Sequence, residues 1–232
     1  MKRTIFFTAA FLSLLGLMES RAQNMQNNRN MEKLKLTEEW DKTFPKSDKV
    51  DHSKVTFVNR FGITLAADLY VPKIAVADKF PAIAVSGPFG AVKEQSSGLY
   101  AQTLAERGFL TIAFDPSFTG ESSGQPRSVA SPDINTEDFS AAVDYLATRP
   151  DVDAERIGIL GICGWGGFAI NAAANDTRIK ATGLLPCTIS AAPMPTVISM
   201  QRTMQMHATG CVGSSMRNAQ KIIVRVLTPA RQ

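Results

Sequence analysis

One stretch of the chain, Arg156 to Ala174, limits the possible folds more than any other, and it reads R-I-G-I-L-G-I-C-G-W-G-G-F-A-I-N-A-A-A. Ile157 to Ile162 is a short, almost wholly apolar run, which is typical of a parallel strand covered on both faces. Ala169 to Ala174 has a helix-favouring composition. Cys163 lies between the two with glycines on both sides, where the backbone can turn sharply. The stretch therefore predicts a strand, a tight turn and a helix.

The position of Cys163 in this turn fits three interpretations. A strand-to-helix turn exposes a nucleophile at the top of a sheet and directs a helix N-terminus at it, which favours a thiolate and a developing oxyanion. Cysteine is also commonly a buried, inert residue. Glycine-rich turns of this type bind phosphates as well. A dinucleotide is disfavoured, because the turn lacks G-x-G-x-x-G and no acidic residue follows about twenty residues later.

Strands and helices are predicted to alternate along the rest of the chain. Apolar and alternating runs predict strands at 55–59, 63–71, 81–86 and 109–114, and helices over 97–107 and 133–148. The first two strands form a hairpin, and the later ones imply βαβ units and a parallel sheet. Ligands of such sheets bind at the carboxyl ends of the strands. The loops after Ser86, Phe114 and Ile162 should all open on that edge.

The basic charge of the protein is confined to its C-terminal tail. The 232 residues are enough for one sizeable α/β domain, and the formal net charge is +4. All 21 acidic residues precede Leu184, and residues 184–232 contain neither an acid nor an aromatic residue. Because the preceding part is close to neutral, the charge gives no reason to expect a nucleic-acid partner.

The N-terminus has the pattern of a signal peptide over residues 1–22. Lys2 and Arg3 precede an apolar run from Ile5 to Met18, and small residues follow, with cleavage expected near Ala22. We expect an exported protein, periplasmic or secreted, with no stable membrane span after cleavage, because the run is short. An uncleaved membrane anchor is the alternative. Residues 23–54 are expected to be an N-terminal lead-in.

Four motifs, in this order along the chain, resemble those of α/β-hydrolases of the dienelactone-hydrolase-like branch. The segments are S-G-P-F-G-A-V-K-E-Q (86–95), L-Y-A-Q-T-L-A-E-R-G-F (99–109), F-D-P-S-F-T-G-E-S-S-G (114–124) and the G-I-C-G-W-G-G turn. The resemblance implies an α/β fold with an α/β-hydrolase-type, mostly parallel sheet and flanking helices over residues 55–183, truncated after the strand that follows the nucleophile elbow. The turn departs from G-x-S-x-G, because Trp165 stands at the last glycine and the nucleophile is a cysteine.

The same resemblance implies an acyl-transfer site. Cys163 would attack an acyl carbon, and the backbone N–H of Gly164 would form half of an oxyanion hole. Pro88 has no N–H, so Phe89 is the candidate for the second donor; alternatively, the glycines around it only permit the turn. Trp165 would line or cover the pocket, with plain core packing as the alternative. Asp115 is interpreted as stabilising its turn through its side chain.

A catalytic triad also needs a histidine and an acid, and the encoded set is incomplete. The chain contains only His52 and His207. His52 precedes the first predicted strand in a polar segment and is expected to be solvated, while His207 lies in a stretch without a regular pattern. No acidic residue follows Asp176, so the usual order of nucleophile, acid and base is absent.

The composition of the tail suggests a shift of reading frame. Back-translation of residues 186–200, read from the third base of each codon, permits M-Y-D-I-S-R-A-N-A-N-G-Y-F-D, and residues 216–227 permit A-Q-R-T-E-D-Y-x-x-G-T-Y. Acidic and aromatic residues return together in both segments. We therefore interpret residues 184–232 as an aberrant tail, out of frame and truncated. A genuine divergent tail is the alternative.

Two classes of function follow from the sequence. The first is hydrolysis or acyl transfer on an ester, thioester or lactone, with a small-molecule acyl substrate and a Cys163 nucleophile, inactive in this chain because the triad is incomplete. The second is a non-catalytic exported binding module on the same scaffold. No metal site is predicted, because no His, Cys and Asp cluster has ligand spacing. No cofactor is predicted either, and no pattern indicates an oligomeric state.

Overall fold

The computed structural model of the chain describes residues 32–73 and 78–185. Within this range, Leu34 and the residues after it belong to one compact unit. The predicted signal peptide, residues 23–31 of the predicted lead-in, His207 and the tail from residue 186 onward lie outside the described residues. Among the residues described, no helix is long and apolar enough to cross a membrane.

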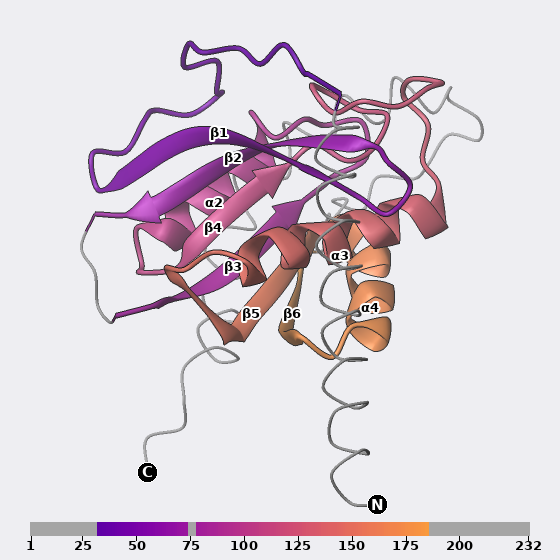
Figure 1. Ribbon diagram of the computed structural model, residues 1–232. Helices are drawn as coiled ribbons and strands as arrows, with labels where there is room; N and C mark the ends of the chain where they lie inside the picture. Colours follow the sequence, from indigo (N-terminus) through magenta and orange to yellow (C-terminus); the bar gives the residue numbers. More distant parts are fainter. Residues whose placement is uncertain (1–31, 74–77, 186–232) are drawn as a thin grey trace, which may run out of the picture. The chain divides into compact units, whose positions relative to one another are not determined.

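A six-stranded, mostly parallel sheet forms the centre of the described fold (Figure 1). The strand order is β1-β2-β4-β3-β5-β6, and β1 and β2 are antiparallel to their neighbours, whereas β4, β3, β5 and β6 run parallel. The strands are β1 (Val50–Val58), β2 (Thr64–Pro72), β3 (Phe80–Ser86), β4 (Leu110–Phe114), β5 (Val152–Ile162) and β6 (Ile179–Leu185). The predicted entry hairpin and the parallel sheet that follows it are confirmed.

Helices cover both faces of this sheet. α2 (Ser96–Ala105) lies on one face, and α3 (Pro132–Ala147) and α4 (Trp165–Asn175) lie together on the other (Figure 1). Successive strand residues point to opposite faces, so Ala82 and Ala84 of β3 join the core under α3 and α4, while Ile83 and Val85 join the core under α2. Because both faces of β3 are covered, its residues before Ser86 are all apolar.

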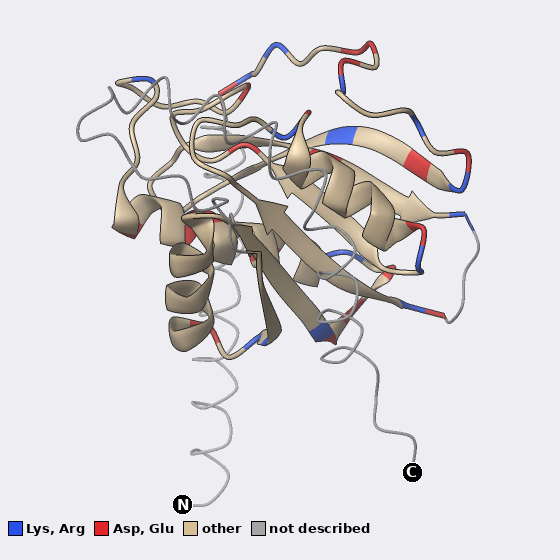
Figure 2. Ribbon diagram, turned by 180° about the vertical axis from the view of Figure 1, so that it is seen from behind, with Lys and Arg blue, Asp and Glu red and all other residues tan. Residues whose placement is uncertain are grey.

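Strand β1 begins earlier than the sequence predicts. It starts at Val50 rather than at residue 55, so residues 50–54 belong to the sheet and not to the lead-in. The sequence pattern is misleading here because the four consecutive residues 51–54, which include Asp51, His52 and Lys54, are all polar. All three have ionic partners on the folded protein, and β1 carries both acidic and basic residues (Figure 2). These pairings make a polar strand stable.

Candidate active site

Cys163 occupies the turn that the sequence predicts. It lies between the end of β5 at Ile162 and the start of α4 at Trp165, and its φ is 60°, in the left-handed region that residues other than glycine rarely adopt. Its backbone N–H donates a hydrogen bond of 2.8 Å to the carbonyl of Leu185 in β6. A Cβ at Gly161 would be 2.4 Å from the carbonyl oxygen of Trp165, so only glycine fits beneath the turn. The strand, turn and helix are confirmed.

The structure brings together the two residues that the sequence predicts as oxyanion donors. Gly164 is the N-cap of α4, where backbone N–H groups have no partner within the helix. The ring of Phe89 lies directly against it: a Cβ at Gly164 would be 2.0 Å from Cε2 of Phe89. The loop after β3 also packs on the Cys163 turn at Gly87, where a Cβ would be 2.4 Å from the carbonyl oxygen of Ile162.

Trp165 belongs to the core of the fold and also borders a cavity. It is 2% exposed and belongs to the core under α3 and α4. Its ring centroid lies 5.0 Å from that of Phe168, 6.0 Å from that of Phe89 and 6.1 Å from that of Phe139. Trp165 also lines a cavity. It therefore links the core of the fold to the space beside the turn.

This cavity has a volume of about 490 Å³, within the usual range for small-molecule sites. Its wall comes from the loop after β3, the loop after β4, the segment before α3 and the start of α4, including Pro88, Phe89, Pro116, Val129 and Trp165. None of the described residues that line it carries a charged side chain. The cavity is thus suited to an uncharged, largely apolar group.

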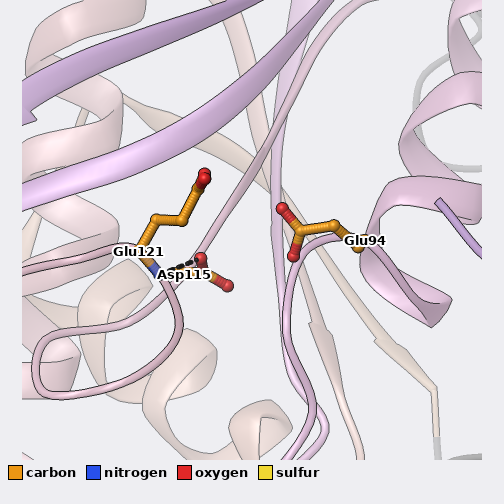
Figure 3. A group of neighbouring side chains, drawn as sticks. All are labelled: Glu94, Asp115 and Glu121. Atoms are coloured by element: carbon orange, nitrogen blue, oxygen red, sulfur yellow. Dashed lines mark hydrogen bonds between the residues drawn. The ribbon is translucent and has the colours of Figure 1, made fainter. Parts of the chain in front are cut away.

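Three carboxylates, those of Glu94, Asp115 and Glu121, lie close to one another (Figure 3). The first comes from the loop after β3, and the other two come from the loop after β4. Their oxygens lie within 4.8 Å of one another, close enough for a metal ion. The ammonium of Lys93 lies among them, however, with Nζ 2.5 Å from Glu94 Oε1, 2.8 Å from Asp115 Oδ2 and 2.7 Å from Glu121 Oε2. Lys54 Nζ also lies 2.7 Å from Glu121 and 3.5 Å from Glu94. The cations that balance these acids are therefore lysines of the chain itself.

Burial and the neighbouring charges shift the protonation equilibria of this cluster. Burial alone would lower the pKa of Lys93, but the attraction of Asp115 and Glu94 outweighs it and raises the pKa. Burial raises the pKa of Asp115, and the charge of Lys93 limits that rise. Burial would also raise the pKa of Glu121, but hydrogen bonds from Lys54 and Lys93 lower it to about 2. Lys93 and Glu121 are therefore charged at neutral pH.

Asp115 stabilises its turn, as the sequence predicts. Its Oδ2 accepts a hydrogen bond of 2.9 Å from the backbone N–H of Glu121, and its backbone carbonyl accepts one of 2.6 Å from the Ser122 hydroxyl. A Cβ at Gly120 would be 2.2 Å from Asp115 Oδ2, so the turn closes tightly over the carboxylate. Sequence analysis missed the partner, Lys93. The signal available was a lysine next to a glutamate in the otherwise apolar loop after β3.

The prediction that His52 is solvated is wrong. Its Nε2 lies 2.9 Å from Oδ1 of Asp68, and its ring packs between Trp40 and Tyr70. An aspartate inside the buried strand β2 could have indicated such a partner, because a buried charge is normally paired. His52 cannot serve Cys163, since three strands separate β1 from β5, about 19 Å at the spacing of neighbouring strands. His207 lies outside the described residues.

Comparison with known proteins gives the family. The sequence profile of the X-Pro dipeptidyl-peptidase (S15) family matches residues 62–215, more than half of the chain. The chain belongs to the S15 family. This S15-family chain is 64% identical over 182 residues to the uncharacterized protein PA2218 of Pseudomonas aeruginosa, covering 77% of the chain and 49% of that protein. It is also 34% identical over 129 residues to the thiohydrolase aneE of Aspergillus aculeatus, covering 56% of the chain and 39% of aneE.

Solved structures agree with this assignment. The crystal structure of PA2218 matches with a TM-score of 0.66 and 58% identity, over 87% of the S15-family chain and 62% of PA2218. The α/β hydrolase GrgF of Penicillium sp. sh18 matches with a TM-score of 0.54 and 27% identity, over 62% of the chain and 48% of GrgF. The protein is thus a member of the α/β-hydrolase superfamily. The chain spans about half the length of the curated relatives it matches.

Proposed function

We propose that this α/β-hydrolase is an acyl hydrolase or acyl transferase of the dienelactone-hydrolase-like type, with Cys163 as the nucleophile toward an ester, thioester or lactone. The observation that carries the proposal is the left-handed conformation of Cys163 between β5 and α4. A strained backbone of this kind is characteristic of a nucleophile held at the top of an α/β sheet. The Cys163 side chain is half-buried and forms no disulfide.

In the proposed reaction, the Cys163 thiolate attacks the acyl carbon and the carbonyl electron pair moves onto oxygen. The backbone N–H groups of Gly164 and Phe89 donate to that oxyanion, and the loss of one such donor costs about 3 kcal/mol in the barrier. Collapse of the adduct expels the alkoxide or thiolate leaving group and leaves a thioester on Cys163. Water, or an acceptor hydroxyl or thiol, then releases the acyl group.

The cavity supports an uncharged, apolar acyl substrate. Phe89 and Trp165 line it and also pack against the Cys163 turn, so a group in the cavity would lie beside the turn. The relative aneE is a thiohydrolase by name, which supports thioesters among the possible substrates. Because the sequence predicts a signal peptide, we also propose that the protein acts outside the cytosol.

We further propose that the chain as written does not turn over substrate. A general base is needed to complete the cycle. His52 is paired with Asp68 near the opposite edge of the sheet, three strands away from β5. The base and the acid would be encoded downstream of the shift, in the frame that the back-translation of residues 186–200 and 216–227 suggests. Acylation of Cys163 without efficient release is the behaviour we expect of this chain.

The experiment is mass spectrometry of the protein after treatment with iodoacetamide and, separately, with 4-nitrophenyl butyrate near neutral pH. We expect one carbamidomethyl group or one butyryl group on the peptide that contains Cys163, formed faster than on Cys187 or Cys211. The Cys163→Ser variant, which keeps the shape of the residue, should lose the alkylation. An inert Cys163 thiol would refute the proposal.

The second candidate is a non-catalytic binding module. The absence of a base for Cys163 among the described residues and the presence of an uncharged cavity favour it. Saturable binding of a neutral ester, retained in Cys163→Ala and without any acyl adduct on the native protein, would select this function over the first.

A further inference from the structure

We infer that Lys93 is a positioning residue, which holds the two loops of the cavity against each other and thereby fixes the backbone of Phe89 beside Cys163. The inference rests on the proposed function for its catalytic consequence. Its structural content, that one buried lysine links the two loops, stands on contacts that are independent of any reaction. Lys93 does not line the cavity, so it would act through the loops and not by touching a substrate.

Lys93 binds one carboxylate with both its backbone and its side chain. Its backbone N–H donates 2.8 Å to Oδ1 of Asp115, and its Nζ donates 2.8 Å to Oδ2 of the same residue. Both side chains are fully buried. Lys93 lies in the loop that follows β3, and Asp115 begins the loop that follows β4. These two contacts therefore fix the position and the orientation of one loop relative to the other.

Glu121 closes the second loop onto the same group. Its carboxylate accepts a hydrogen bond of 2.7 Å from Lys93 Nζ, and its backbone N–H donates 2.9 Å to Asp115 Oδ2. The first part of the loop after β4, residues 115–121, is thus held at one end by Asp115 and at the other by Glu121. Lys54 of β1 also reaches Glu121, at 2.7 Å, which ties the cluster to the edge of the sheet.

The held segments are the ones that form the cavity wall. Pro88, Phe89 and Ala91 come from the first loop, and Pro116 and Thr119 come from the second. A buried ammonium is stabilised only when charged or polar partners surround it. If either loop moved away, Lys93 would lose a buried partner, so the cluster opposes separation of the two loops. The first of these loops carries Phe89, whose ring contacts Gly164.

A metal ion held by the same three carboxylates would join the loops in a different way. A bound ion can leave, whereas the ammonium of Lys93 is covalently part of the first loop. The ammonium can therefore occupy its site only when the first loop is in place. This covalent link is why we assign the cluster to positioning.

The test compares Lys93→Met with Glu94→Gln. The first removes the cation that joins the loops. The second removes a carboxylate that binds the same ammonium from the adjacent residue and whose other ionic partner, at 3.5 Å, is Lys54 of strand β1, so it does not join the two loops to each other. Two rates at Cys163 are measured: acylation by 4-nitrophenyl butyrate, which needs the oxyanion donors, and alkylation by iodoacetamide, which does not. We expect Lys93→Met to lower the ratio of acylation to alkylation by about tenfold or more, and Glu94→Gln to leave it within about twofold.

Hydrogen exchange of the same variants separates this inference from the proposed function. In Lys93→Met, amides of residues 87–92 and 116–121 should exchange faster while those of α3 keep their protection. If the native protein is alkylated but never acylated, the proposed function fails and the exchange data still decide the role of Lys93. Unchanged protection of both loops in Lys93→Met would overturn the inference. If the native protein is acylated, an unchanged ratio of acylation to alkylation in Lys93→Met would overturn it as well.

A second variant keeps the test decisive if Lys93→Met does not fold. Glu121→Gln has a partly exposed side chain and keeps the size of the residue, so it should fold. It should speed exchange in residues 116–121 and lower the rate ratio severalfold. Native values of both quantities in Glu121→Gln would count against the inference.

Discussion

The ring of Phe89 lies so close to Gly164 that a Cβ at Gly164 would be 2.0 Å from Cε2 of Phe89. Gly164→Ala must therefore displace the Phe89 ring or the loop that carries it. We expect a loss of about 1–3 kcal/mol in the free energy of unfolding, as for other overpacked sites, together with slower acylation of Cys163. Urea unfolding and ester labelling measure the two effects.

The matched control lies three residues further along the same turn and helix. Gly167 has nothing within 4 Å of the position that a Cβ would take. Gly167→Ala should leave labelling unchanged and stabilise the helix by up to about 1 kcal/mol. Equal effects of the two substitutions would show that the contact between Phe89 and Gly164 has no special role.

The ionic cluster should make the stability of the protein depend on acid. The pKa of Glu121 is about 2 in the folded protein, against an ordinary value of 4.5. Because the folded pKa is the lower one, the contribution of Glu121 is fully present above pH 4.5 and is lost as the pH falls toward 2. Thermal unfolding measured between about pH 5 and about pH 2.5 should show this loss.

Two glutamine variants identify the source of that loss. Glu121→Gln should be less stable than the native protein at pH 5 and should lose less stability on acidification. Glu155→Gln removes a largely exposed carboxylate and should keep the native slope. A native slope in Glu121→Gln would mean that other carboxylates account for the acid sensitivity.

His52 should contribute to stability and not to reactivity. Its ring is paired with buried Asp68, whose other oxygen lies 3.1 Å from Lys42 Nζ. His52→Ala leaves that carboxylate with one partner fewer, and we expect a loss of about 1–3 kcal/mol in the free energy of unfolding. The rate of Cys163 alkylation should stay the same. Slower alkylation at unchanged stability would instead make His52 part of the site.

The reading frame of the gene is directly testable. DNA sequencing from the codon of Cys163 to well beyond the stop codon should show that a one-base change restores M-Y-D after the last described strand, with a downstream Asp and His. A protein made from the corrected frame should release the acyl group and turn over repeatedly. A sound frame without such codons would favour the binding module.

The sequence predicts those parts of the candidate site whose backbone conformation depends on residues that are neighbours in the chain. The turn at Cys163 is recognisable because an apolar strand, flanking glycines and a helix-forming run adjoin in the sequence. The loop of Phe89 is recognisable for the same reason: Gly87 and Pro88 follow a buried strand directly. In both cases the residues that determine the conformation lie within a few positions of each other.

Pairings between distant residues could not be read in the same way. Lys93 and Asp115 are 22 positions apart and His52 and Asp68 are 16 apart, and nothing in the sequence says which acid meets which base until the strand order is known. The start of β1 was misplaced for a related reason. Polar residues look like a solvated segment until the folded protein supplies their partners.

The position of β3 in the sheet has a consequence for synthesis of the protein on the ribosome. β3 lies between β4 and β5, and both of these strands are translated after it. Until Ile162 has emerged, β3 presents at least one unpaired edge, and its run of apolar residues is open to pairing with other nascent chains. Translation that pauses between β3 and β5 therefore exposes the most aggregation-prone intermediate, and chaperone capture in that interval should raise the yield of folded protein.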